Sequence, residues 1–232
     1  MGTTVSLDLD GVPPSLARVL ADETFAYLHG IDEQFSTYRP TSEVCSPLAS
    51  PSPRLAAVLD RCSTLWTLTN GYFDAYATGR LDPSGFVKGW AVQVASDRLV
   101  EAGAVNHCLN AGGDLLVRGR CAGRPWRIGV RHPFSPEQVC CVVSGTDLAV
   151  ATSGVYERGP HVIDPFTGTP AHGLRSVTVT GPDLGDADAY ATAAVAMGAA
   201  GLEWLATLPG YSSAVVTDDG RFFCSDGFPA VP

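Results

Sequence analysis

Hydrophobic and polar residues alternate at the start of the chain and then change to a helical period. The sequence VSLDLD at residues 5–10 alternates apolar and polar positions, which predicts a strand over 3–10. In three longer stretches the apolar residues recur at helical spacing, and these stretches predict helices over about 14–35, 52–69 and 88–102. The first half of the chain is therefore expected to be mainly helical.

Short apolar runs separated by turn residues fill most of the second half. They predict strands near 106–110, 114–118, 126–131, 138–144, 148–151, 161–164, 175–180, 212–217 and 221–224. A loop is expected over 152–160, and two further helices over about 186–198 and 200–207. Strands that follow helices, rather than alternating with them, favour an α+β fold.

Composition and charge narrow the class of protein. The 232 residues are 45% hydrophobic and 17% charged, a globular mixture that suits a single domain over 1–232. The net charge is −9 and Lys88 is the single lysine, so the sequence lacks the basic patch of a protein that binds nucleic acid. An acidic protein that binds a phosphorylated ligand needs a metal ion or backbone N–H groups to offset the charge.

The cysteines and the N-terminus bear on the cellular compartment. The odd number of cysteines, seven, and the adjacent pair Cys140 and Cys141 fit neither a disulfide framework nor a zinc ribbon. Free thiols in a reducing compartment are expected. The N-terminus lacks the basic and apolar regions of a signal peptide, and no apolar stretch reaches the length of a membrane span. A cytoplasmic protein without a membrane span is predicted.

The segment DPSGFVKGWA at residues 82–91 is a candidate site for an anionic ligand. Gly85 can adopt a positive φ angle and let a ligand approach the backbone. Lys88 is expected in the first turn of the third helix, where a cation opposes the helix dipole unless an anion docks there too. An ordinary loop with a solvated lysine is the alternative.

Two further segments combine glycine with small polar residues. NAGGD at residues 110–114 reads either as a hairpin turn or as a cradle for a phosphate or a base. Thr152 and Ser153 stand beside a glycine, as in turns that surround a ligand. His161 begins an apolar strand and could equally be a core histidine bonded to a backbone group.

The fourth helix offers a pair of oxygen ligands. Asp188 and Thr192 are four residues apart, so both side chains project from one helix face. A carboxylate and a hydroxyl suit Mg²⁺, with water and substrate phosphate completing the coordination. In the alternative, Asp186 or Asp188 caps the helix and Thr192 is a packed helical residue.

Taken together, these segments resemble the ApbE family, the FAD:protein FMN transferases. Residues 1–3 (MGT) are similar to the family's opening strand, and 35–40 (FSTYRP) to its F-S-x-Y-x-P segment. The remaining similarities follow in the family's order at 82–91 (D-x-G-x-x-x-K-G-x-A, with Ser84 and Gly85 in place of the commoner paired glycines), 110–114 (N-A-G-G-D), 151–154 (A-T-S-G), 161–170 (H-I-I-D-P-x-T-G-x-P) and 188–192 (D-A-x-x-T).

The resemblance implies a two-lobed α+β fold of mixed or antiparallel strands and flanking helices, with FAD in the cleft between the lobes. Mg²⁺ would be held by Asp188, Thr192 and the backbone oxygen of Gly85. The FAD site would be lined by Met1, Tyr38, Lys88, Asn110, Ala111, Gly112, Gly113, Asp114, Thr152, Ser153 and His161. His161 and Asp188 would be the catalytic residues, with His161 near the pyrophosphate.

The activity implied is Mg²⁺-dependent transfer of FMN from FAD to a threonine or serine hydroxyl of an acceptor flavoprotein, with release of AMP. Many family members have a longer segment before Asp82 than this chain has. The shorter segment leaves the flavin pocket either more open or completed by a second subunit of a homodimer. An FAD pyrophosphatase, a flavin-binding protein without catalysis and a ligand-free scaffold are the alternatives.

Overall fold

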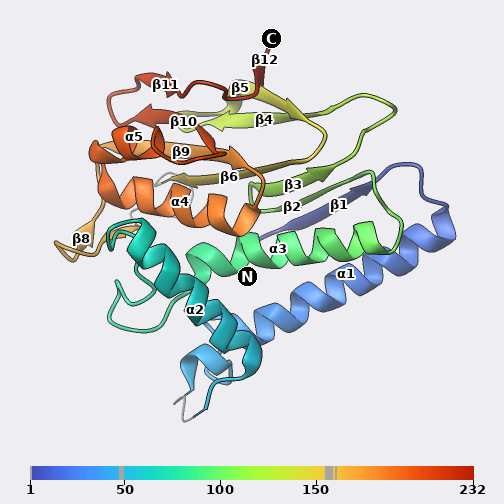
Figure 1. Cartoon of the computed structure of the whole chain (residues 1–232), viewed down its shortest axis with the longest axis horizontal. Coiled ribbons are helices and arrows are strands. Elements are labelled where there is room, and N and C mark those ends of the chain that lie inside the picture. The colour runs from blue at the N-terminus through green and yellow to red at the C-terminus, as the bar shows by residue number, and fades with distance from the viewer. Residues whose placement is uncertain (1, 47–49, 155–158, 160) are drawn as a thin grey trace.

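A seven-stranded antiparallel sheet with the order β1-β2-β3-β6-β9-β10-β11 forms the centre of the fold (Figure 1). The computed structural model describes residues 2–46, 50–154, 159 and 161–232. The strands of this sheet are β1 (Val5–Leu9), β2 (His107–Ala111), β3 (Asp114–Arg118), β6 (Leu148–Gly154), β9 (Leu174–Gly181), β10 (Ser212–Thr217) and β11 (Phe222–Cys224). The first strand of the chain thus pairs with β2, from the middle of the chain.

Two smaller sheets complete the strands. The first has the order β12-β5-β4 and consists of β4 (Trp126–His132), β5 (Ser135–Gly145) and β12 (Ala230–Val231). It packs on one face of the large sheet through a buried apolar cluster made of Leu115, Val117, Val130, Val143 and Val150. The second is the short hairpin of β7 (Ile163–Asp164) and β8 (Thr169–Pro170).

Helices lie on the opposite side of the large sheet. They are α1 (Pro14–Phe35), α2 (Pro53–Leu68), α3 (Ser84–Glu101), α4 (Leu184–Met197) and the short α5 (Ala200–Leu205), with a 3₁₀ turn η1 (Glu43–Cys45). Of these, α3 packs on β2 and β3, α4 packs on β6 and β9, and α1 packs on α3 (Figure 1). Helices together with antiparallel sheets confirm the α+β class.

Small residues let α3 and α4 approach closely. A Cβ atom added at Gly89 would lie 2.3 Å from the carbonyl oxygen of Leu184 and 2.9 Å from the Cβ of Asp188. A Cβ at Gly185 would lie 2.8 Å from the ring of Phe86. Because neither position carries a side chain, the two backbones come together and Asp188 lies directly against α3.

Several sequence-based boundaries are wrong. The third helix begins at Ser84, not near residue 88, so Lys88 lies in its second turn and Gly85 is helical, without a positive φ angle. The expected loop over 152–160 is strand as far as Gly154. The fourth helix begins at Leu184 and is capped by Asp183, so neither Asp186 nor Asp188 is the cap.

At the two helix starts, local hydrogen bonds and packing against neighbouring elements outweigh the low helix propensity of glycine. The backbone N–H of Ser84 donates to the Asp82 side chain at 3.1 Å, which starts the helix before the glycine. The short elements η1, β8 and β12 were not expected from the sequence.

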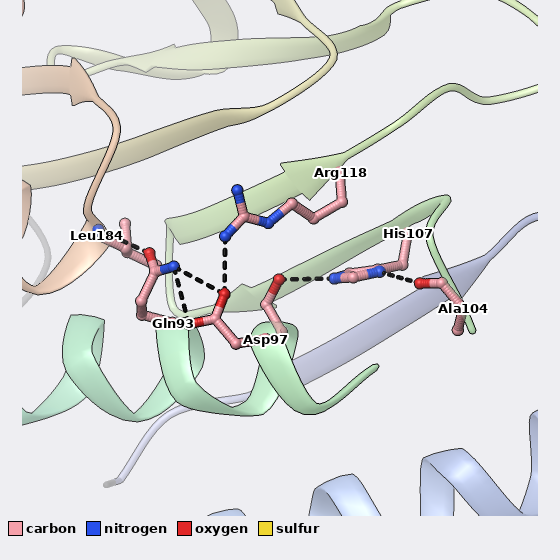
Figure 2. Close-up of polar contacts among 7 residues, drawn as sticks. Gln93, Asp97, Ala104, His107, Arg118 and Leu184 are labelled. Carbon is pink, nitrogen blue, oxygen red and sulfur yellow. Dashed lines mark hydrogen bonds and ion pairs between the residues drawn. The ribbon is translucent and has the colours of Figure 1, made fainter. Parts of the chain in front are cut away.

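Polar contacts connect α3 to the sheet, as Figure 2 shows. His107 on β2 is fully buried, and its Nδ1 lies 2.7 Å from the carbonyl of Ala104. A carbonyl can only accept, so Nδ1 carries the proton and Nε2 accepts from the hydroxyl of Ser96 at 2.7 Å in the neutral ring. Arg118 donates to Asp97 at 2.8 Å beside it.

The structure bears on two expectations from the sequence, free thiols and the lack of a membrane span. All seven cysteines are free. Within the described residues, the helices are too short or too polar to cross a membrane. The extent of the domain, 1–232, stays a prediction.

We expect Gly89→Ala to lower the free energy of unfolding by at least about 2 kcal/mol, because the new methyl group meets the backbone of α4. The matched control is Gly30→Ala in α1, where an added Cβ has nothing within 4 Å. That change is expected to be neutral or to stabilise by up to about 1 kcal/mol. Urea denaturation of both variants measures the difference, and equal effects would contradict the close packing of α3 on α4.

We also expect a pH dependence that comes from His107. Burial lowers the pKa of its imidazole below the usual value. Between that lowered pKa and about 6.5, the unfolded chain therefore binds more protons than the folded one, and the free energy of unfolding falls as the pH falls. Comparing wild type with His107→Asn by urea denaturation from pH 7.5 to 4.5 should show a shallower loss in the variant. Parallel curves would be the contrary result.

Candidate functional site

A pocket of about 380 Å³ opens between the helices and the ends of the central strands. Its walls come from the end of α1 and the loop after it, residues 72–82, the start of α3, the end of β6, residues 161–163 and one face of α4. Most of the site residues expected from the sequence line it: Tyr38, Gly85, Lys88, Gly112, Thr152, Ser153, His161, Asp188 and Thr192. Segments far apart in the sequence therefore meet here.

The rest of the NAGGD segment lies behind the pocket wall. Residues 110–114 form the β2–β3 hairpin turn, with positive φ angles at Gly112 and Gly113. Asn110 accepts the N–H of Gly113 at 3.0 Å, and Ala111 is buried. The hairpin reading of this segment is thus confirmed, and Gly112 alone of the five lines the pocket. Met1, also expected at the flavin, lies outside the described residues.

Lys88 sits between two buried carboxylates on the pocket side of α3. Its ammonium group contacts Asp114 Oδ2 directly and lies 3.4 Å from Asp188 Oδ2. The side chains of Asp114 and Asp188 are 0% and 3% exposed, and that of Lys88 is 20% exposed. Two carboxylates facing one ammonium leave this cluster with a net negative charge, which favours binding of a further cation.

Backbone N–H groups hold both carboxylates in place. Asp114 Oδ1 accepts the N–H of Thr152 at 3.0 Å, which ties β3 to β6. Asp188 Oδ2 accepts the N–H of Gly89 at 3.1 Å, across the α3–α4 contact. In a regular helix that N–H donates to the carbonyl of Gly85. The carboxylate of Asp188 and the carbonyl of Gly85 therefore lie near the same donor.

Thr192 brings a hydroxyl to the same place. It follows Asp188 by one helical turn and lines the pocket with it. Its Oγ1 lies 3.1 Å from the hydroxyl of Ser153, and a Cβ added at Gly85 would lie 3.3 Å from it. The absence of a side chain at Gly85 keeps this corner open for a ligand.

These oxygens fit a hard cation that keeps part of its coordination for water and substrate. Among the described residues, no group of three or more histidine, cysteine, aspartate or glutamate side chains could hold a metal ion. One carboxylate, one hydroxyl and one carbonyl are too few for an all-protein cage. They suit Mg²⁺, which usually takes one or two carboxylates and fills its octahedron with water and phosphate oxygens.

His161 is exposed and lines the pocket, so it is not a core histidine; His107 is the buried one. The Nδ1 atom of His161 lies 2.9 Å from the carbonyl oxygen of Gly159. Because a carbonyl only accepts hydrogen bonds, Nδ1 carries a proton. In the neutral ring Nε2 is then the nitrogen that can accept a proton. His161 can therefore serve as a general base.

Tyr38 is 84% exposed although it lines the pocket. The loop that carries it is fastened by Arg39, whose guanidinium lies 3.1 Å from Asp32 at the end of α1. The hydroxyl of Ser42 also donates to the carbonyl of Ser36 at 2.6 Å. An exposed ring on a fastened loop is suited to stacking on a planar ligand.

Further pocket residues were not expected from the sequence, including Asp32, Tyr72, Asp74 and Thr78. One signal was available, because the sequence DAYAT occurs twice, at 74–78 and 188–192. The first and last residues of both copies line the pocket. The first copy forms a tight turn, in which Asp74 Oδ1 accepts the N–H of Tyr76 at 2.7 Å.

The sequence is similar to those of the ApbE family. The model of the ApbE family matches residues 1–79 and 76–216. An FAD:protein FMN transferase of Rhodobacter capsulatus is 36% identical over 155 residues, which are 63% of this chain and 30% of the relative. One of Vibrio cholerae is 36% identical over 129 residues, which are 51% of this chain and 39% of the relative. The chain thus spans less than half the length of these curated relatives.

Solved structures extend the likeness to the fold. The flavin transferase ApbE of Vibrio cholerae superposes with a TM-score of 0.85 at 25% identity, over 100% of this chain and 96% of that one. The ApbE protein of Thermotoga maritima superposes with a TM-score of 0.84 at 24% identity, over 97% of this chain and 94% of that one. The fold is therefore that of the flavin transferases.

We expect Asp114→Ala to lower the free energy of unfolding by about 2 kcal/mol or more, because it leaves Lys88 and the N–H of Thr152 without this acceptor. Asp114→Asn keeps an acceptor for Thr152 and should cost less. The matched control is Asp97→Ala, whose half-exposed pair with Arg118 should contribute less than about 1 kcal/mol. Urea denaturation checks the order, and equal effects at 114 and 97 would contradict it.

Proposed function

Because the chain belongs to the ApbE family, we propose that it is an FAD:protein FMN transferase. The enzyme would move the FMN half of FAD to a threonine or serine hydroxyl of an acceptor protein and release AMP. Family membership follows from the match of the family model to residues 1–79 and 76–216. The observation that carries the proposal beyond membership is the negative cluster of Asp114, Lys88 and Asp188 at the pocket.

The charge of that cluster supports a pyrophosphate substrate that arrives with a divalent cation. FAD carries negative charge on its phosphates, and an acidic pocket would repel it without a cation between them. We propose that Asp188, Thr192 and the backbone oxygen of Gly85 hold Mg²⁺. Bound there, Mg²⁺ supplies Lewis-acid neutralisation of charge on the phosphate oxygens. The ammonium group of Lys88 would hold the side chains of Asp114 and Asp188 in place.

The remaining residues of the pocket would orient FAD. Tyr38 offers an exposed ring for stacking, while Thr152 and Ser153 line the wall beside Thr192. Gly112 permits close approach of the backbone, with Asn110, Ala111, Gly113 and Asp114 shaping the turn behind it. The role of Met1 stays a prediction.

His161 would handle the proton of the acceptor hydroxyl. As the hydroxyl oxygen bonds to the FMN-side phosphorus, its proton passes to Nε2 of His161. The bond from that phosphorus to the oxygen of the AMP half breaks, and AMP leaves with the electron pair. The chain's own contribution is positioning and charge, as is usual for phosphoryl transfer.

We place the reaction in the cytoplasm, a proposal that the seven free thiols support because such thiols persist in a reducing compartment. The acceptor would be a separate flavoprotein. Assembly as a homodimer stays a prediction.

We expect Asp188→Ala to lower the rate of FAD turnover by about 100-fold or more, since a metal ligand acting in the transition state contributes several kcal/mol. The matched control is Asp186→Ala on the same helix, which breaks the pair with Arg61 outside the pocket lining. AMP release in the presence of a threonine-containing acceptor is measured across a magnesium titration, with thermal unfolding of both variants. Full activity of Asp188→Ala at all magnesium concentrations would refute the metal assignment.

The partition between transfer and hydrolysis tests the activity itself. We expect AMP to be released from FAD and Mg²⁺ only when a protein or peptide hydroxyl is supplied, because transfer consumes one acceptor for each AMP. Chromatography quantifies AMP, and mass spectrometry quantifies FMN on the acceptor. Equally fast AMP release without any acceptor would favour an FAD pyrophosphatase, and tight FAD binding without AMP would favour a binding protein.

A further inference from the structure

Three aromatic side chains form one surface beside the pocket mouth. Trp66 near the end of α2 and Phe166 in the β7–β8 hairpin are 53% and 65% exposed, and Tyr72 lies between these elements. We call Trp66, Tyr72 and Phe166 the aromatic patch. Large exposed aromatic residues gathered at one place are typical of a binding surface.

The patch is built around Gly71. A Cβ atom added there would lie 3.1 Å from Phe166 Cζ and 3.5 Å from Trp66 Nε1, so both rings border the same glycine. The rings of Tyr72 and Phe166 meet edge to face with centroids 4.8 Å apart. Figure 1 shows the end of α2 beside the hairpin that carries β8.

Local hydrogen bonds fix the backbone under these rings. In the hairpin, Asp164 Oδ1 accepts the N–H of Phe166 at 2.9 Å, and the Asp164 carbonyl accepts the N–H of Gly168 at 2.8 Å. At the end of α2, Gly71 adopts φ +86° and donates its N–H to the carbonyl of Trp66 at 2.7 Å. The patch is therefore held in position before any partner binds, which lowers the entropic cost of binding.

The patch continues into the pocket. Tyr72 lines the pocket and touches Phe166, and Ile163, which starts the same hairpin, lines the pocket too. A chain that passes over the patch thus arrives at the wall formed by His161 and Tyr72.

We propose that the aromatic patch is the docking surface for the acceptor protein, and that it selects apolar side chains flanking the hydroxyl that receives FMN. This inference rests on the proposed function, because transfer to a protein requires its hydroxyl to enter the pocket while the flanking residues stay on the rim. The patch carries no charged group, so the matching chemistry on the partner is apolar or aromatic.

The test uses two synthetic peptides that carry one threonine each. One has leucine and phenylalanine beside the threonine, and the other has serine and glycine at the same positions. Isothermal titration calorimetry without FAD measures their binding. The apolar peptide should bind about tenfold more tightly or better, because buried aromatic anchors dominate such interfaces.

Substitutions in the aromatic patch test whether the apolar peptide binds there. Trp66→Ala and Phe166→Ala should each weaken binding of the apolar peptide by about tenfold and leave the affinity for FAD unchanged, because neither side chain lines the pocket. The matched control is Phe222→Ala on β11, an exposed phenylalanine in an edge strand. Equal affinity of the two peptides, or unchanged affinity in both patch variants, overturns the proposal. A shift from dimer to monomer on Trp66→Ala also overturns it, because a second copy would then occupy the patch.

A separate readout distinguishes failure of the surface from failure of the proposed function. Each peptide is incubated with enzyme, FAD and Mg²⁺, and mass spectrometry detects FMN on its threonine. Tighter binding of the apolar peptide without any FMN transfer would contradict the proposed reaction and still support the docking surface. Transfer at equal rates to both peptides would support the reaction and contradict the docking surface.

Discussion

The contact between α3 and α4 at Gly89 places the groups on which the site depends. With no side chain at that position, Asp188 on α4 reaches the backbone N–H of Gly89 and comes within 3.4 Å of the Lys88 ammonium. The central sheet supplies the second carboxylate, Asp114, from the other side of Lys88. One helix pair packed on one sheet thus gathers three charged groups from distant parts of the chain, at a spacing that larger residues at the helix contact would prevent.

The balance of charge at this contact links packing to chemistry. The carboxylates of Asp114 and Asp188 and the ammonium group of Lys88 together carry one more negative than positive formal charge. The excess negative charge favours binding of a divalent cation. In a protein whose net charge is −9, that cation would offset the repulsion of a phosphate-bearing substrate. Tyr38, His161 and Tyr72 of the aromatic patch line one pocket. Binding of FAD, activation of a hydroxyl and docking of its protein would all take place at the same opening.

Residue spacing was sufficient to predict some of this arrangement. The interval of four between Asp188 and Thr192 places both on one helix face whatever the helix packs against, and the paired glycines after Asn110 specify a hairpin turn. Contacts between residues distant in sequence could not be predicted from residue spacing. The DAYAT sequence forms a turn at 74–78 and a helix at 188–192, so its surroundings decide its structure. The start of α3 at Ser84 and the cap at Asp183 rest on local hydrogen bonds, with Asp82 and Asp186 respectively. The approach of Phe166 to Gly71 depends on residues distant in sequence.

The central claim is that a divalent cation occupies the corner between α3 and α4 when the pyrophosphate of FAD is bound. The most direct measurement is a crystal structure with FAD and Mn²⁺ in place of Mg²⁺, read by anomalous scattering. The account predicts one strong peak in contact with the Asp188 carboxylate, the Thr192 hydroxyl and the Gly85 carbonyl, with phosphate oxygens on its open side. A peak elsewhere on the protein, with FAD bound in the pocket and no ion at Asp188, would contradict it.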